Sequence, residues 1–161
     1  MPLNTRLLSL CALAVATEGV VLQAGFQRPV ELSDRLRGAE KAVVARVETV
    51  EARFERNRFG DELIISHVRL VVEEGLKGER DRELWIDVEG GTVGDLTLEV
   101  SDLPALAVGD RGVFLMERTP EGAFVPHLRG QGILKLDRDD QVVGTGLTLA
   151  QIRNVARQVG R

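Results

Sequence analysis

Alternation of apolar and polar residues dominates the middle of the chain. Residues 42–54, AVVARVETVEARF, are rich in valine, and their apolar positions change parity between Glu48 and Val50, which predicts a strand with a bulge there. Residues 63–74, LIISHVRLVVEE, alternate over their whole length. A short polar segment, residues 55–62, separates the two runs, so the pattern predicts a hairpin of two long strands.

Shorter apolar runs follow, and turn-forming residues separate them. ELWIDVEGG, DLTLEV and RGVFLMER predict three further strands, and AFVPHL and GILKLD predict two more short ones. TPEG places a proline where a β-turn favours it, and DRDD is a polar turn. The predicted bounds of these five strands are 83–91, 95–100, 111–118, 123–128 and 132–137.

Two segments have the period of a helix instead. One apolar stripe predicts a short helix over residues 31–39, with Ser33 as its N-terminal cap. In the other segment, TLAQIRNVARQV, Thr148 is followed three residues later by Gln151, which is the order of a capping box. Apolar side chains then recur on one face, so the pattern predicts an amphipathic helix over residues 148–159.

The order of these elements indicates a mainly β fold. Strands and helices do not alternate, which argues against a parallel sheet built from strand–helix–strand units. We therefore predict a small antiparallel barrel or sandwich, preceded by the short helix and followed by the amphipathic one. A chain of 161 residues suggests a single domain, which would extend over residues 31–161.

The beginning of the chain has the composition of an export signal. Arg6 precedes the uncharged apolar run LLSLCALAV, and Ala14 and Ala16 form a small-x-small cleavage site. We predict a signal peptide over residues 1–16, with an alternative cleavage position after Ala24. The mature protein would then act in the periplasm or outside the cell.

Charge and composition narrow the candidate functions. Loss of the signal peptide would leave 20 of the 21 basic residues and all 25 acidic ones, a net charge of −5. It would also remove Cys11, the only cysteine, so the mature chain would have neither a thiol nor a disulfide. An acidic chain without tyrosine does not suit nucleic acid, which requires a basic groove and stacking aromatic side chains.

The stretch EGGTVGD, residues 89–95, is as rich in glycine as a phosphate-binding loop. A dinucleotide loop requires glycine where Glu89 stands, and a helix begins at its end, whereas an alternating strand pattern follows here. We interpret the stretch as a bend between two strands, where the chain turns tightly or lies close to a neighbour. The candidate contact loop that it would form at the rim of the barrel consists of Gly90, Gly91, Thr92, Val93 and Gly94.

Residue spacing predicts no catalytic, cofactor or metal site. His67 and His127 are sixty residues apart, and neither has a second histidine at the spacing of metal ligands. The serines do not lie in a nucleophile turn, and DRDD lacks the glycine and the distal glutamate of a calcium loop. We expect His67 to be solvated or hydrogen-bonded on the polar face of its strand, and His127 to lie at the end of a short strand.

Four stretches together resemble a layout of exported bacterial proteins of uncharacterised function: AEKAVVARVETVEARF, HVRLVVEEGLKGE, EGGTVGD and LPALAVGDRGVFLM. Over residues 32–137 this layout is similar to the five-stranded oligomer-binding (OB) barrel of netrin-like and metalloproteinase-inhibitor domains. Lys41, Arg46 and Leu106 depart from it, because they replace an aspartate, a glycine and an aromatic residue. The resemblance implies an OB-like fold, but the N-terminal cysteine with which the inhibitors chelate zinc has no counterpart in the mature chain.

These observations favour an exported, non-enzymatic binding or accessory domain that recognises another envelope or extracellular protein through its surface. One alternative is a protease-associated or protease-inhibitory domain, which an exposed apolar loop would support. The other is a small hydrolase, which a pocket where His67 or His127 meets two carboxylates would support. We expect no cofactor, no nucleic acid partner and no stable membrane span in the mature chain.

Overall fold

The computed structural model describes residues 29–56 and 60–160. The predicted signal peptide, residues 1–16, and its alternative cleavage position after Ala24 lie outside the described residues. The elements follow in this order: α1 (Leu32–Gly38), β1 (Lys41–Arg56), β2 (Glu62–Lys77), β3 (Glu83–Glu89), β4 (Gly91–Val93), β5 (Leu96–Leu98), β6 (Arg111–Arg118), β7 (Phe124–Pro126), a 3-10 helix η1 (Arg129–Gly132), β8 (Ile133–Leu136) and α2 (Leu149–Val159).

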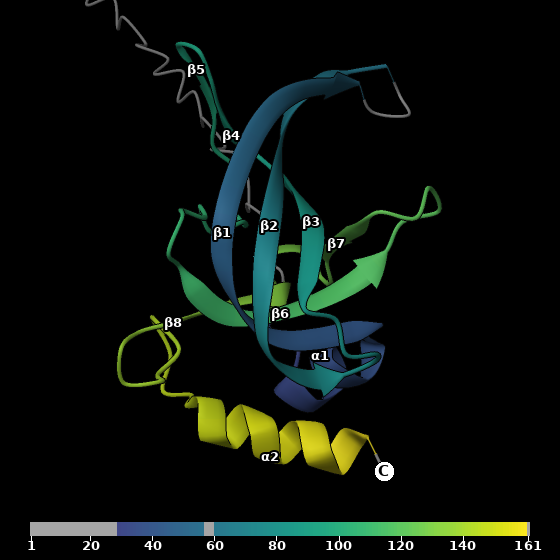
Figure 1. Cartoon of the computed structure of the whole chain (residues 1–161), viewed down its shortest axis with the longest axis vertical. Coiled ribbons are helices and arrows are strands. Elements are labelled where there is room, and N and C mark those ends of the chain that lie inside the picture. Colours follow the sequence, from purple (N-terminus) through teal and green to yellow (C-terminus); the bar gives the residue numbers. More distant parts are fainter. Residues whose placement is uncertain (1–28, 57–59, 161) are drawn as a thin grey trace, which may run out of the picture.

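Six strands form one antiparallel sheet, which confirms the predicted mainly β fold (Figure 1). The hydrogen-bonded order is β3-β2-β1-β6-β7, and β8 pairs with the half of β6 that β7 leaves free. Strands β3 and β7 end this path and contact each other, but no ladder joins them in the described part of the chain. The sheet is therefore a curved, open barrel with a seam between β3 and β7.

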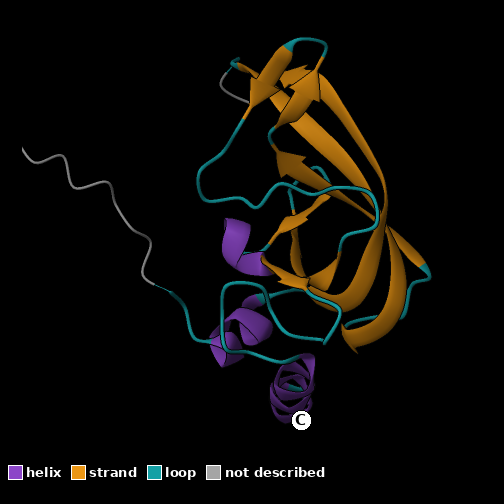
Figure 2. Cartoon of the chain, turned by 90° about the vertical axis from the view of Figure 1, so that its left-hand side faces the viewer, coloured by secondary structure: helices purple, strands orange, loops and turns teal. Residues whose placement is uncertain are grey.

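Two apolar cores lie on opposite faces of the central strands β1 and β6. One lies among the strands and includes Ile86 and Phe114, and the other lies under both helices and includes Leu115 and Ile152. Figure 2 shows α1 and α2 gathered at one end of the sheet. Because both faces of β1 are covered there, residues 41–45 are buried without alternation.

Both predicted helices are present. α2 begins at the predicted capping box, in which the Gln151 amide donates to the Thr148 hydroxyl at 3.3 Å and the Thr148 amide donates to the Gln151 side chain at 2.8 Å. The predicted cap of α1 is wrong, because the helix begins before Ser33 and Glu31 is its N-cap. Neither helix of the described residues has the length and apolar character needed to cross a membrane.

A lysine from the sheet stabilises the C-terminal end of α1. The Lys77 ammonium donates to the carbonyl oxygens of Leu36 and Arg37 at 2.9 and 2.8 Å, and to that of Ala39 at 2.5 Å. A cation at this end satisfies carbonyl groups that have no partner within the helix, and it interacts favourably with the helix dipole.

The long hairpin is confirmed together with its irregularity. β1 and β2 pair over their length, and the register shifts between Val47 and Thr49, at the predicted bulge. β2 alternates as expected, with Val68 buried and His67 on the other face. A bulge increases local twist and bends the strand, which helps the sheet to curve.

The predicted third and fourth strands have different bounds in the structure. β3 ends at Glu89, and residues 91–93 form β4, which pairs with β5 in a small hairpin. Gly90 and Gly91 have φ angles of 103° and 131°, where glycine is favoured. A Cβ on Gly91 would lie 2.4 Å from the Ser66 hydroxyl oxygen, and that hydroxyl donates to the Gly90 carbonyl oxygen at 2.6 Å. The prediction of a bend that lies close to a neighbour is confirmed.

Candidate functional site

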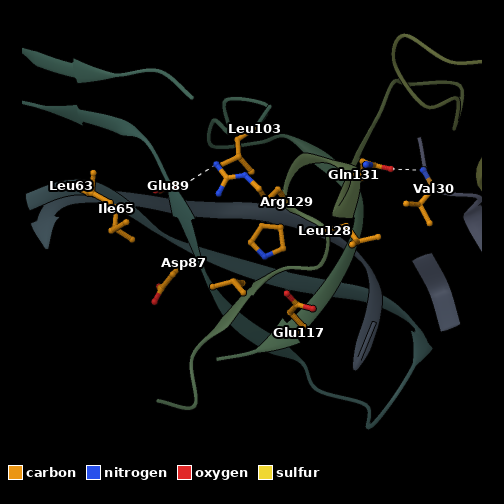
Figure 3. A pocket seen from close by; sticks show the side chains of 12 residues that line it. Val30, Leu63, Ile65, Asp87, Glu89, Leu103, Glu117, Leu128, Arg129 and Gln131 are labelled. Carbon is orange, nitrogen blue, oxygen red and sulfur yellow. Dashed lines mark hydrogen bonds and ion pairs between the residues drawn. The ribbon is translucent and has the colours of Figure 1, made fainter. Parts of the chain in front are cut away.

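A pocket of about 710 Å³, here termed the seam pocket, opens beside β3 and β7, where the sheet is not closed (Figure 3). This volume lies within the range of about 300–1,000 Å³ that is typical of small-molecule sites. Apolar side chains form most of the lining, and charged side chains from three elements converge on it. The lining consists of Val30, Leu63, Ile65, Leu103, Val125, Pro126 and Leu128, together with Asp87, Glu89, Glu117, Arg129 and Gln131.

Strand alternation brings both kinds of side chain to the seam pocket. The apolar residues of β3 belong to the core among the strands, so Asp87 and Glu89 project from the opposite face. Ile65 is the pairing partner of Glu89 in β2, and it projects from the same face with Leu63. Because β3 is an edge strand, these side chains are open to solvent on one side.

Arg129 joins three parts of the fold at the wall of the seam pocket. Its guanidinium is 2.9 Å from a Glu89 carboxylate oxygen and donates to both oxygens of Asp102, at 2.5 and 3.1 Å. The hydrogen bond from Arg129 lowers the pKa of Asp102 below its ordinary value. The hydrogen bonds to Asp102 and then to Glu89 raise the pKa of Arg129. This clamp connects β3, the loop before β6 and η1.

The backbone that presents Arg129 is strained. Leu128 and Arg129 are consecutive left-handed residues, with φ angles of 55° and 56°, and each costs about 1 kcal/mol or more. Gly130 packs directly against the neighbouring loop, since a Cβ there would lie 1.8 Å from the Asp102 carbonyl oxygen. A Cβ on Gly132 would lie 2.4 Å from the His127 carbonyl oxygen. Only glycine permits this close approach, which fixes the lining residues Arg129 and Gln131 at the pocket.

Both histidines lie behind carboxylates of the seam pocket. His67 Nε2 is 2.9 Å from a Glu55 oxygen, and its Nδ1 is 2.7 Å from an Asp87 oxygen. His127 Nδ1 is 2.5 Å from a Glu117 oxygen. The prediction of a hydrogen-bonded His67 on the polar face of its strand is confirmed, although its side chain is only 14% exposed. Neither ring belongs to the described lining of the pocket.

Each pocket carboxylate retains one oxygen that has no protein donor. Asp87 Oδ1 contacts a histidine, Glu89 Oε2 contacts Arg129, and Glu117 Oε2 contacts the other histidine. No hydrogen bond from a described residue reaches the second oxygen of these carboxylates. The pocket therefore offers three oriented acceptors beside an apolar surface (Figure 3).

A second pocket, of about 810 Å³, lies beneath the β4–β5 hairpin and is here termed the mouth pocket. Val68 and Val88, from the core face of β2 and β3, form part of its floor, and the loop before β6 forms one side. Glu89 and Leu103 line both pockets. The Arg129 clamp is therefore part of the partition between the two cavities.

The predicted contact loop is divided between the mouth pocket and the projecting hairpin. Its first three residues line the mouth pocket, and the last two lie farther along the hairpin; in order, they are Gly90, Gly91, Thr92, Val93 and Gly94. Gly94 begins the two-residue turn with a φ of 59°, where a type II′ hairpin turn favours glycine. Leu96, just after the turn, is 61% exposed.

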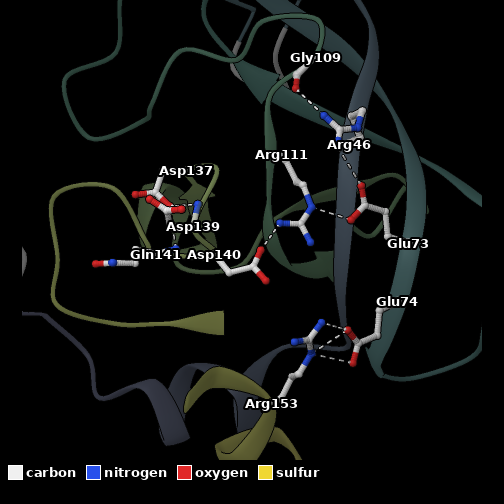
Figure 4. Close-up of polar contacts among 10 residues, drawn as sticks. All are labelled: Arg46, Glu73, Glu74, Gly109, Arg111, Asp137, Asp139, Asp140, Gln141 and Arg153. Atoms are coloured by element: carbon white, nitrogen blue, oxygen red, sulfur yellow. Dashed lines mark hydrogen bonds and ion pairs between the residues drawn. The ribbon is translucent and has the colours of Figure 1, made fainter. Parts of the chain in front are cut away.

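The charged face near α2 is compensated within the protein (Figure 4). Arg111 lies between Glu73, at 2.6 Å, and Asp140, to which it also donates. Arg153 of α2 donates to both oxygens of Glu74. Two hydrogen bonds reach Oε2, at 2.6 and 2.9 Å, and one reaches Oε1, at 3.2 Å. The first carboxylate of DRDD accepts two backbone amides of the same turn, which confirms that turn.

The described residues contain no group of three or more His, Cys, Asp or Glu side chains that could hold a metal ion. The described lining of the seam pocket includes no serine, threonine, cysteine or lysine as a nucleophile.

No known protein family matches the sequence, and no curated protein sequence matches it.

The seam pocket was not predicted from the sequence. One signal was available in β3, where ELWIDVE places three acidic residues and Trp85 on the face opposite the core, on a strand that proved to be an edge. Glu117 and Arg129 had no comparable local signal, because they come from β6 and η1 and approach β3 only in the folded chain.

Proposed function

We propose that the protein is an exported, non-enzymatic binding or accessory domain, and that the seam pocket is its binding site. The observation that carries this proposal is an apolar cavity with a few oriented polar groups, situated where the sheet has two unpaired edges. The partner would be another envelope or extracellular protein, or a small molecule that such a protein carries.

Two features favour binding over catalysis. The lining side chains named above provide acceptors and apolar contacts but no hydroxyl, thiol or amine nucleophile. Their anchoring contacts to Arg129 and the histidines fix the carboxylates in place, as a preorganised binding site requires. The hydrolase alternative draws support from His67, which meets both Glu55 and Asp87. The protease-inhibitor alternative draws support from the projecting hairpin with exposed Leu96.

The pocket can be tested with an uncharged, environment-sensitive dye such as Nile red. We expect the purified mature protein to bind the dye, and Val125→Trp, which fills the pocket from β7, to weaken binding by about tenfold or more. Val143→Trp is the matched control, because Val143 is 62% exposed and lies outside both pockets. Equal dye binding by a folded Val125→Trp protein would argue against the seam pocket as the site.

The natural partner can be sought with the same pair of variants. Tagged mature protein would be used to capture partners from the envelope and the culture fluid, and the captured set should be lost with Val125→Trp and retained with Val143→Trp. Turnover of chromogenic esters or glycosides that disappears in Asp87→Asn would instead favour the hydrolase.

Export and the OB-like resemblance remain part of the proposal. The acidic mature chain, the predicted signal peptide and the open-barrel topology support them. N-terminal sequencing of the protein from its native host tests export, and an N-terminus at Met1 would contradict it.

A further inference from the structure

We propose that the ligand of the seam pocket is an apolar cation: a primary ammonium or guanidinium group attached to a hydrocarbon body or to an apolar peptide segment. This inference rests on the proposed function and specifies its ligand. It rests on three properties of the pocket's charged groups: their negative charge, the contacts that hold them, and their positions in the pocket.

The body of the ligand is specified by the apolar floor. The apolar lining comes from Leu63 and Ile65 of β2, Val125 of β7, Leu128, and Leu103 of the loop before β6. Removal of such surface from water favours an apolar partner in proportion to the area covered. A small hydrophilic cation would leave these apolar side chains exposed to water.

The charge of the ligand is specified by three carboxylates. Asp87, Glu89 and Glu117 line the pocket, and each has one oxygen without a donor among the described residues. An ammonium group has three donors and a guanidinium has five, so either can satisfy more than one of these oxygens. Figure 3 shows Asp87 and Glu117 in the lower half of the view, on the strands that border the seam.

The one arginine of the lining does not create an anion site. Arg129 already contacts Glu89 and both oxygens of Asp102, so its charge is compensated within the protein. An anionic ligand would have to displace one of these carboxylates and would meet the remaining ones at close range. Like charges at close range oppose binding, so the pocket discriminates against anions.

The free edge of β3 favours a peptide as the source of this chemistry. The Gly90 amide donates to Ile64 and the Val72 amide donates to Arg82, so alternate residues of β3 bond to β2. Antiparallel alternation then directs the backbone groups of Trp85, Asp87 and Glu89 toward the open edge. No backbone hydrogen bond joins these groups to another described residue. An extended peptide can pair with such an edge, whereas a free amine cannot.

The test compares three probes of one length: octylammonium, octanol and octanoate, each displacing Nile red from the wild-type protein at pH 7 and low salt. We expect octylammonium to bind about tenfold more tightly than octanol, and octanoate to bind more weakly than octanol. The preference should shrink in 0.5 M salt because ions screen the partly exposed carboxylates.

Variants assign the preference to the pocket. Asp87→Asn and Glu117→Gln should each reduce octylammonium affinity by about threefold to fivefold and leave octanol unchanged. Glu121→Gln is the matched control, because Glu121 is an exposed carboxylate of the turn after β6 and lies outside the pocket. Thermal unfolding of each variant shows whether it is folded. The comparison of the three probes on the wild-type protein does not depend on any variant.

The outcomes separate the two proposals. Equal binding of the three probes, or tighter binding of octanoate, overturns the cationic ligand but leaves the pocket as a binding site. Absence of binding by dye and probes alike overturns the proposed function itself. A blocked peptide such as Leu-Val-Lys-Leu, if it binds more tightly than octylammonium, supports the peptide source; weaker binding supports a free amine.

Discussion

The helix-covered end of the molecule and the seam use charged and apolar residues in opposite ways. At the helix end, β1 and β6 are buried on both faces, and the arginines Arg111 and Arg153 are matched by carboxylates. At the seam, β3 has a core on one face only, and the carboxylates beside it keep unpartnered oxygens. The first arrangement matches its arginines within the protein, whereas the second leaves both apolar surface and acceptors at a pocket.

This difference separates the source of stability from the site of binding. Burial on both faces removes the most apolar surface from water and dominates the free energy of folding. An edge strand contributes less to folding, and its outward face can be changed with little effect on the core. We therefore expect a substitution at the helix end to lower the free energy of unfolding more than the same substitution on the outward face at the seam.

The largest effect is expected from a cavity at the helix end. Leu115 of β6 is fully buried under the helices, so Leu115→Ala should lower the free energy of unfolding by about 3–5 kcal/mol. Leu63→Ala removes the same atoms from a partly exposed position at the seam and should cost about 1 kcal/mol. Urea unfolding measures both. Similar losses for the two variants would contradict the proposed division of stability.

A second prediction concerns the strained turn at the seam. Gly130→Ala would place a Cβ 1.8 Å from the Asp102 carbonyl oxygen, so η1 and the loop before β6 must separate. We expect a loss of about 2–3 kcal/mol and weaker dye binding by the seam pocket. Gly146→Ala is the control, since a Cβ there meets open space and should change stability by less than about 0.5 kcal/mol. A folded Gly130→Ala protein with unchanged stability would show that this contact does not fix the turn.

The sequence predicted most of the fold because the strongest signals were local. The bulge near Glu48 follows from a change of parity, and the capping box at Thr148 follows from two residues three positions apart. The predicted cap at Ser33 was wrong because α1 begins one residue earlier, with Glu31 as its N-cap, and Lys77, which stabilises the other end, is distant in sequence. The separate β4 strand was missed because two glycines concealed its alternation.

The candidate site could not be predicted in the same way. The contact loop at Gly90–Gly94 was proposed from composition, and the structure places part of it on the mouth pocket, where its function is untested. The seam pocket depends on the approach of β3, β6 and η1, and on which strands become edges. No local period in the sequence encodes that arrangement.

The third prediction compares two surface arginines. Arg153→Gln removes one partly exposed ion pair and Arg129→Gln removes two, and since such pairs contribute little, each variant should lose about 1 kcal/mol or less in stability. Only Arg129→Gln frees an oxygen of Glu89 at the seam pocket, and it should raise the affinity for octylammonium by about twofold to fivefold. Competition with Nile red measures this change. A similar gain for Arg153→Gln would indicate a general charge effect instead of a local one.

The smallest expected effect concerns the pH dependence of the clamp. Arg129 lowers the pKa of Asp102 in the folded protein below its ordinary value, which is about 3.9 in an unfolded chain. The stabilisation by this carboxylate is therefore present above about pH 4–5, and it is lost as the pH falls through the lower folded pKa. Because the side chain of Asp102 is 41% exposed, solvent screens the pair and the effect should be below about 1 kcal/mol.

Urea unfolding of the wild type and Asp102→Asn at pH 7 and pH 2.5 measures this term. We expect the wild type to be more stable at pH 7 and the difference to shrink at pH 2.5, as Asp102 takes up its proton. Asp95→Asn is the control, because Asp95 lies at the tip of the hairpin without an ion-pair partner among the described residues. A difference for Asp102→Asn that persists unchanged at pH 2.5 would mean that the loop before β6 is fixed by packing of Gly130, and that charge at the seam serves binding alone.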